Sequence, residues 1–150
     1  MSFKPTLQDF HAKALSDYGI EDIWPEPVLK AAKIASEKLT QDKDYLEEFP
    51  FVTIDGEDAK DFDDAIFCTF NDDGFHLKVA IADVSFFVRE HSALDLEAAK
   101  RTTSVYMPKK VVPMLPERLS NELCSLQPYK RRRCLCVEIN FDKDGHITNY

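Results

Sequence analysis

Through the first forty residues, apolar side chains recur every three or four positions, which is the period of an α-helix. A first helix is predicted over residues 6–18, with Thr6 as its cap. A second helix is predicted over residues 25–39, opened by prolines and apolar along one side. The polar, acidic segment 40–48 is predicted to be a connection. We therefore interpret residues 1–49 as a helical N-terminal extension or linker.

After residue 50 the apolar period shortens to two, which is typical of β-strands. The elements predicted there are strands at 51–54, 65–70, 75–82, 135–141 and 146–150, a helix at 94–103, and an irregular, proline-containing segment at 111–126. Turn residues at 71–74 and 142–145 join neighbouring strands into hairpins. We predict an α+β fold, with N-terminal helices followed by antiparallel hairpins and a mixed sheet.

Composition narrows the class of protein. Of the 150 residues, 44% are hydrophobic and 31% charged, as in an ordinary globular domain. No apolar run approaches the ~20 residues of a membrane helix, and the N-terminus has no apolar signal region. We expect a cytoplasmic protein with no membrane partner. The four cysteines lack the spacing of a zinc or redox motif, so we expect them to be reduced and mostly buried.

The net charge is −8, which alone argues against a nucleic-acid partner. Its distribution changes that conclusion, because residues 100–133, the basic strip, hold nine basic and two acidic residues. Such a strip can bind phosphates. For the run at 130–133 alone, a solvated loop is an equally good interpretation.

Segment 53–65 is rich in acidic residues, which make up six of its thirteen positions. Carboxylates this close repel one another, and a divalent cation such as Mg²⁺ or Mn²⁺ offsets that cost with hard oxygen ligands. The candidate ligands are Asp55, Asp61, Asp63 and Asp64. The spacing does not fit the calcium loop of an EF-hand.

Segment 53–65 resembles the central motif of the RNB family, which comprises ribonuclease II and ribonuclease R. The stretch Gly56–Ala59 and the residue Phe62 are closer to the ribonuclease R branch. Four further blocks resemble the family in the same order, at residues 79–85, 103–108, 112–116 and 119–126.

The resemblance implies Mg²⁺-dependent hydrolysis of single-stranded RNA from its 3′ end, releasing 5′-mononucleotides. It identifies Asp55, Asp61, Asp63 and Asp64 as the catalytic and metal-binding aspartates, with Asp55 and Asp64 as direct ligands. Tyr106 matches the aromatic residue that stacks on a base near the 3′ end, although a core tyrosine is the alternative. Asp83 is left as a structural residue.

The sequence departs from the family in two respects. Phe86 and Phe87 stand where the family often has a histidine and a tyrosine. A second stacking aromatic, an arginine and a glutamate, which the family places later in the domain, have no counterpart here. We therefore interpret residues 50–150 as the N-terminal part of an RNB catalytic domain, truncated at its C-terminus and inactive alone. The alternative is an RNA- or metal-binding fragment, or a divergent homologue, without catalytic activity.

Overall fold

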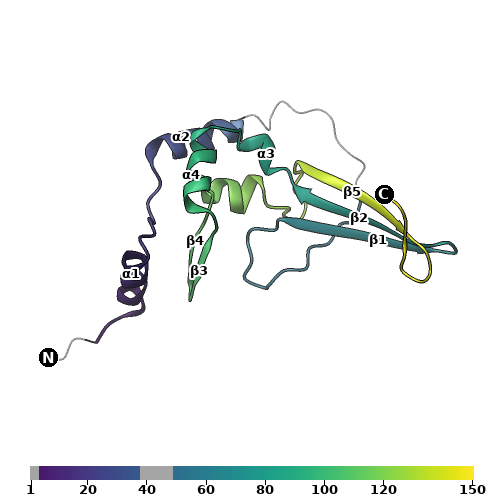
Figure 1. Ribbon diagram of the computed structural model, residues 1–150, viewed down its shortest axis with the longest axis horizontal. Coiled ribbons are helices and arrows are strands. Elements are labelled where there is room, and N and C mark those ends of the chain that lie inside the picture. Colours follow the sequence, from purple (N-terminus) through teal and green to yellow (C-terminus); the bar gives the residue numbers. More distant parts are fainter. Residues whose placement is uncertain (1–3, 38–48) are drawn as a thin grey trace.

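The computed structural model describes residues 4–37 and 49–150. The elements are α1 (Leu7–Asp17), α2 (Glu26–Glu37), β1 (Asp64–Asn71), β2 (Gly74–Ala82), α3 (Val84–Phe87), α4 (Ala93–Arg101), β3 (Val105–Met107), β4 (Lys110–Val112), η2 (Arg118–Leu123), β5 (Cys134–Phe141) and β6 (Ile147–Asn149). Helices gather on one side and the long strands on the other, which confirms the α+β class (Figure 1). The predicted connection at 40–48 lies outside the described residues.

Helix α1 begins where the sequence predicts, at a capping box. The Thr6 hydroxyl accepts from the Asp9 amide, and the Asp9 carboxylate accepts from the Thr6 amide at 2.7 Å. Gly19 follows the helix with a φ of +62°. Of the predicted apolar positions, only Leu15 is buried, while Phe10 and Tyr18 are exposed. The helix itself is therefore confirmed, but most of its apolar side faces solvent.

The hydrophobic core lies among the remaining helices, with α2 packed against α3, α4 and η2. Its buried members are Val28, Ala32, Ala35, Ala82, Phe87, Leu94, Leu115, Leu119 and Cys124. The apolar side predicted for the second helix is thus the buried side of α2. No described helix has the length and apolar character needed to cross a membrane.

The larger sheet has the strand order β1-β2-β5-β6. The predicted hairpins at 71–74 and 142–145 are confirmed, and Asn71 closes the first by accepting from the Gly74 amide at 3.1 Å. Every pairing among the described strands is antiparallel, so the parallel pairs of a mixed sheet are not found there. The predicted strand at 51–54 is wrong. Only Val52 pairs, in a single bridge to Ile66, because the chain then leaves the sheet.

The sheet has one largely apolar surface, which we call the apolar face, with Asp64 at its edge opposite Ile81. Residues directly opposite in an antiparallel pair share a side, so the register defines its members. They are Ile66, Cys68, Phe70, Phe75, Leu77, Val79, Ile81, Leu135, Val137, Ile139 and Phe141. The alternation predicted for 75–82 is correct, but it marks the more exposed side, where Phe70, Ile81 and Leu135 face solvent.

The opposite side of the sheet is covered by the segment that precedes it. The rings of Phe49 and Phe51 lie 5.5 and 6.3 Å from that of Phe67. The Lys78 ammonium lies 4.4 Å over the Phe49 ring and pairs with Glu138. A lysine on this side is therefore buried, while its apolar neighbours in the strand are not.

Two further expectations need correction. The segment 111–126 is not irregular throughout, because it contains the end of β4 and the π-helical η2, in which the Cys124 amide donates to the Leu119 carbonyl at 2.8 Å. The cysteines are free thiols, as expected, but only Cys124 is buried. Cys68 and Cys136 are exposed, and they lie on opposite sides of the sheet.

The tight turn between β1 and β2 generates a first prediction. Gly74 has a φ of +142°, and a Cβ there would lie 2.0 Å from the Phe141 carbonyl oxygen. Replacing it with alanine must shift the β2–β5 pairing, so Gly74→Ala should lower the free energy of unfolding by about 2 kcal/mol or more. Urea denaturation followed by circular dichroism measures this. Gly56→Ala is the matched control, because nothing lies within 4 Å of its Cβ position and its φ is not left-handed.

Candidate functional site

The acidic loop, residues 55–64, runs from the Val52 bridge to the first residue of β1. Its last two carboxylates stand at a fixed place on the sheet. The Asp63 carbonyl accepts from the amide of Ala82 at 2.8 Å, and Asp64 pairs with Ile81 at the start of β1. The end of β2 therefore determines where Asp63 and Asp64 stand.

Ser125 fixes the middle of the acidic loop. Its side chain is fully buried, and its hydroxyl donates to the Lys60 carbonyl at 2.7 Å and accepts from the Phe62 amide at 3.1 Å. The neighbouring Leu126 amide donates to the Phe62 carbonyl at 2.9 Å. These bonds satisfy backbone groups on both sides of Asp61. Sequence reasoning missed Ser125, and its only signal was its place in the block at 119–126.

The four predicted aspartates share one electrostatic environment. The pKa of Asp63 is raised, first by desolvation and then by the charges of Asp61, Asp64 and Asp55. Asp63 keeps substantial solvent contact, yet enough protein surrounds its carboxylate for desolvation to be the largest cause. An oxygen-donor set with mutual repulsion fits a hard divalent cation, which would offset that repulsion.

The ligand atoms of these aspartates are not converged. Among the described residues, the only three acidic, histidine or cysteine side chains with ligand atoms all within 4.8 Å of one another are Asp142, Asp144 and His146. Those belong to the turn between β5 and β6, where Asp142 accepts from the His146 amide at 2.9 Å. The charges of the predicted aspartates thus act on one another, but their carboxylate oxygens do not form a closed set of ligands.

Tyr106 is brought to the acidic loop from β3. Its hydroxyl donates to Asp61 Oδ2 at 3.1 Å, across 45 positions of sequence. The side chain is 67% exposed, so the alternative of a core tyrosine is wrong. Partial burial and the Asp61 carboxylate raise the pKa of the phenol, which keeps it protonated as a donor. Sequence reasoning singled out Tyr106 but gave no sign of its bond to an aspartate.

Arginines next to the site are largely occupied within the fold. Arg132 Nε donates to the Ser125 carbonyl at 2.9 Å, behind the acidic loop. Arg133 lies 3.6 Å from Asp83 and 3.9 Å over the ring of Phe86. Asp83 caps α3 by accepting from the Phe86 amide, in agreement with its interpretation as structural. Phe86 therefore stacks on a cation rather than serving a polar role.

The basic strip is less available to phosphates than its composition suggests. Basic side chains of the strip that contact protein groups in the structure include Lys100, Arg101, Lys110, Arg132 and Arg133. Counting charges within residues 100–133 could not show this, because several partners are acidic residues earlier in the chain.

Cys124 lies close to the acidic loop but is not a nucleophile. Burial, with smaller contributions from the charges of Asp63 and Asp83, raises the pKa of its thiol to about 12. Because the thiolate is the reactive form, this buried thiol is inert at neutral pH.

A family model for the RNB domain matches residues 43–150, which include the acidic loop and Tyr106. The chain belongs to the RNB family. It is 47% identical over 141 residues to ribonuclease R of Acidithiobacillus ferrooxidans, covering 91% of this chain and 32% of that protein. It is 46% identical over 142 residues to ribonuclease R of Escherichia coli K12, covering 91% and 18%. This RNB chain thus spans a third or less of the length of these curated relatives.

Solved structures extend the likeness to the fold. The apo form of Mycoplasma genitalium RNase R matches with a TM-score of 0.83 at 38% identity, covering 95% of this chain and 23% of that one. The same enzyme in complex with double-stranded RNA matches with a TM-score of 0.84 at 37% identity, covering 95% of this chain and 26% of that one. Yeast Ssd1, described as a pseudonuclease, matches with a TM-score of 0.52 at 32% identity, covering 58% of this chain and 11% of that one. The fold of this chain is therefore shared with proteins named RNase R and, over part of its length, with one described as a pseudonuclease.

The anchoring of the acidic loop generates a second prediction. Ser125→Ala leaves the Lys60 carbonyl and the Phe62 amide without their buried partner, which should lower the free energy of unfolding by about 1–3 kcal/mol. Ser120→Ala is the matched control. Its hydroxyl bonds only the adjacent Asn121 side chain, so we expect a loss of less than about 0.5 kcal/mol. Urea denaturation of both variants gives the comparison, and equal losses would remove Ser125 from its anchoring role.

Proposed function

We propose that the protein containing this chain is an exoribonuclease, and that the acidic loop and Tyr106 supply part of its active site. The proposed reaction is Mg²⁺-dependent hydrolysis of single-stranded RNA from the 3′ end, releasing 5′-mononucleotides, with Mn²⁺ as a possible substitute. The observation that carries the proposal is the bond from the Tyr106 hydroxyl to Asp61 Oδ2 at 3.1 Å. It brings an exposed aromatic ring and a cluster of carboxylates together from distant segments.

The relatives support an RNA substrate. Curated proteins of similar sequence are named ribonuclease R, and Mycoplasma genitalium RNase R has been solved with double-stranded RNA and with ribose-methylated single-stranded RNA. The likeness to the single-stranded complex has a TM-score of 0.75 over 91% of this chain. The direction of cleavage and the metal rest on the family resemblance and on the donor set.

In this proposal each side chain has a separate task. Bound Mg²⁺ would supply an activated water and charge neutralisation at the attacked phosphate. Asp55 and Asp64 would be its direct ligands, and Asp61 and Asp63 would complete the carboxylate environment. Asp61 also accepts from the Tyr106 hydroxyl, which fixes the direction of that ring. An exposed ring held at one edge presents its face to a base, and stacking of this kind tolerates any sequence.

The alternative is an RNA- or metal-binding protein that does not cleave. Two observations favour it: the open arrangement of the four carboxylates, and the likeness to a pseudonuclease. Binding without hydrolysis distinguishes it from the first proposal. The two functions therefore need an assay that measures RNA binding and mononucleotide release in the same protein.

A chimera provides that assay. In ribonuclease R of Escherichia coli, this chain would replace the 142-residue segment that it matches. We expect the chimera to release mononucleotides from end-labelled single-stranded RNA with Mg²⁺. Asp64→Asn in the chimera keeps the shape but removes a metal ligand, so hydrolysis should fall by roughly 10²-fold or more while RNA binding persists.

Two controls make the result decisive. Asp72→Asn removes an exposed carboxylate from the β1–β2 turn, outside the acidic loop, and should leave hydrolysis unchanged. The 150-residue chain alone should release no mononucleotides, since it holds no counterpart of the family's later aromatic, arginine and glutamate. A chimera that binds RNA but does not cleave it would favour the alternative function, and an active Asp64→Asn chimera would reject the role of Asp64.

Tyr106 generates a separate prediction in the same chimera. If its ring stacks on a base near the cleavage point, Tyr106→Ala should leave longer final products, because stacking contributes ~1–3 kcal/mol per base. Tyr106→Phe keeps the ring and should change product length little. Tyr129→Ala, which removes a fully exposed tyrosine elsewhere, is the control. Denaturing gels resolve the products. Unchanged product lengths in Tyr106→Ala would leave Tyr106 without a stacking role.

A further inference from the structure

The hairpin that carries Tyr106 cannot hold its own position. Strands β3 and β4 pair at three positions only, and this two-stranded sheet is not joined to the larger one. An isolated two-stranded hairpin is at best marginally stable in water. Contacts outside the hairpin must therefore fix where Tyr106 stands relative to Asp61.

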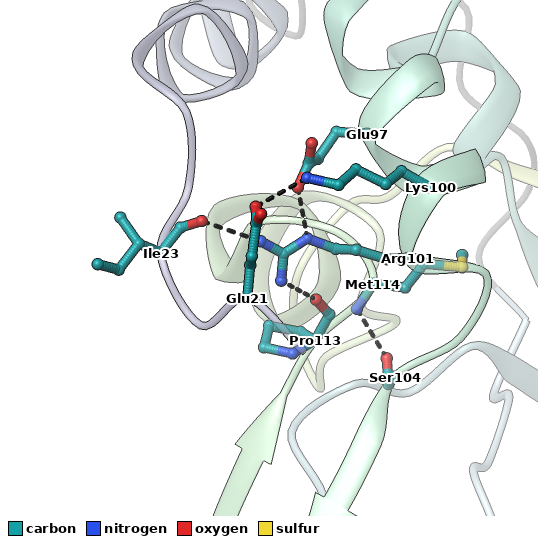
Figure 2. Close-up of polar contacts among 8 residues, drawn as sticks. All are labelled: Glu21, Ile23, Glu97, Lys100, Arg101, Ser104, Pro113 and Met114. Carbon is teal, nitrogen blue, oxygen red and sulfur yellow. Dashed lines mark hydrogen bonds and ion pairs between the residues drawn. The ribbon is translucent and has the colours of Figure 1, made fainter. Parts of the chain in front are cut away.

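The neck of the hairpin is closed by two hydrogen bonds between its incoming and outgoing chains. On one side, Arg101 Nη1 donates to the Pro113 carbonyl at 3.4 Å. On the other, the Met114 amide donates to the Ser104 hydroxyl at 3.0 Å (Figure 2). Arg101 is the last residue of α4, and Thr102 turns the chain into β3 with a φ of +66°. Only residues 102–104 thus separate Arg101 from the start of β3.

The same guanidinium also holds the linker between α1 and α2. Its Nη2 donates to the Ile23 carbonyl at 3.1 Å, and its Cζ lies 3.6 Å from the centre of the Trp24 ring. Figure 2 shows the Arg101 side chain bonded to the linker at Ile23 and to the hairpin neck at Pro113. Beside it, Lys100 pairs with Glu21 at 2.7 Å, and Lys110 of β4 pairs with Asp22.

Arg101 is itself fixed in one orientation. Its Nε donates to Glu97 Oε1 at 2.9 Å, and both side chains are less than a tenth exposed. A planar guanidinium has donors in several fixed directions, so one group can bond Glu97, Ile23 and Pro113 together while stacking on Trp24. An ammonium could pair with Glu97 but could not reproduce this geometry.

We propose that Arg101 is a positioning residue, which fixes the Tyr106 hairpin to the α1–α2 linker and so sets the place of Tyr106 beside Asp61. The α1–α2 linker then contributes to the geometry of the site, because the Tyr106 hairpin is held against it. The consequence for RNA rests on the proposed function of Tyr106. The positioning itself does not, because it is a statement about where the hairpin is held.

Hydrogen exchange in the 150-residue chain tests this directly. Arg101→Lys keeps a cation beside buried Glu97 but removes the shared bonds and the stacking. We expect backbone amides of residues 105–112 to exchange at least ~10-fold faster, while amides of β1 and β2 keep their rates. Lys100→Gln is the matched control. It breaks the neighbouring ion pair to the linker without touching the hairpin neck, and should leave residues 105–112 unchanged.

Each outcome has a defined meaning. A uniform increase across the sheet and the hairpin would show that Arg101 only contributes general stability, and unchanged hairpin exchange would also overturn the proposal. If Arg101→Lys does not fold, a Glu97→Gln/Arg101→Gln double variant removes both buried charges together and should show the same local increase.

The chimera separates positioning from RNA recognition. Arg101→Lys should lengthen the final products as Tyr106→Ala does. If hairpin exchange rises but neither variant alters the products, the positioning stands and the stacking role of Tyr106 fails. If Tyr106→Ala lengthens products while Arg101→Lys changes neither exchange nor length, the stacking stands and the positioning fails.

Discussion

Mutual repulsion among four carboxylates is the constraint on which the arrangement of this site depends. Left to itself, the acidic loop would open to separate its charges. Its backbone is instead bonded at Lys60 and Phe62 by the buried Ser125 hydroxyl, and at Asp63 by the Ala82 amide. Because the anchoring uses main-chain groups, the aspartate side chains remain available to a cation. The main chain of the loop is thus used for anchoring, and its carboxylates are left for binding.

Three regions of the fold meet around this loop. The antiparallel sheet fixes Asp64, the segment after η2 supplies Ser125, and the small β3–β4 hairpin brings Tyr106 (Figure 1). Only the first two belong to the large sheet or to the helical core. The hairpin depends on side-chain contacts at its neck, so the aromatic part of the site is the least constrained by the fold.

Local features of this structure could be predicted from sequence, and long-range ones could not. The Thr6 cap, the turn at 71–74 and the spacing of the aspartates are each encoded within a few residues. The bond from Tyr106 to Asp61 and the anchoring by Ser125 join segments that nothing in the sequence places side by side. The strand expected at 51–54 failed for a related reason, since its pattern is right but its chain finds only one partner residue. Similarly, alternation identified which residues share a face of β2 but not which face is covered.

The two exposed thiols lie on opposite sides of the sheet. Cys68 stands on the apolar face opposite Leu77, whereas Cys136 stands on the other side opposite Ala80. A single thiol-directed label can therefore be attached to either surface by removing the other cysteine. Any molecule that comes to cover the apolar face would shield Cys68 from the reagent and leave Cys136 reactive, so the ratio of the two labelling rates reports the coverage of that face without any change to the acidic loop.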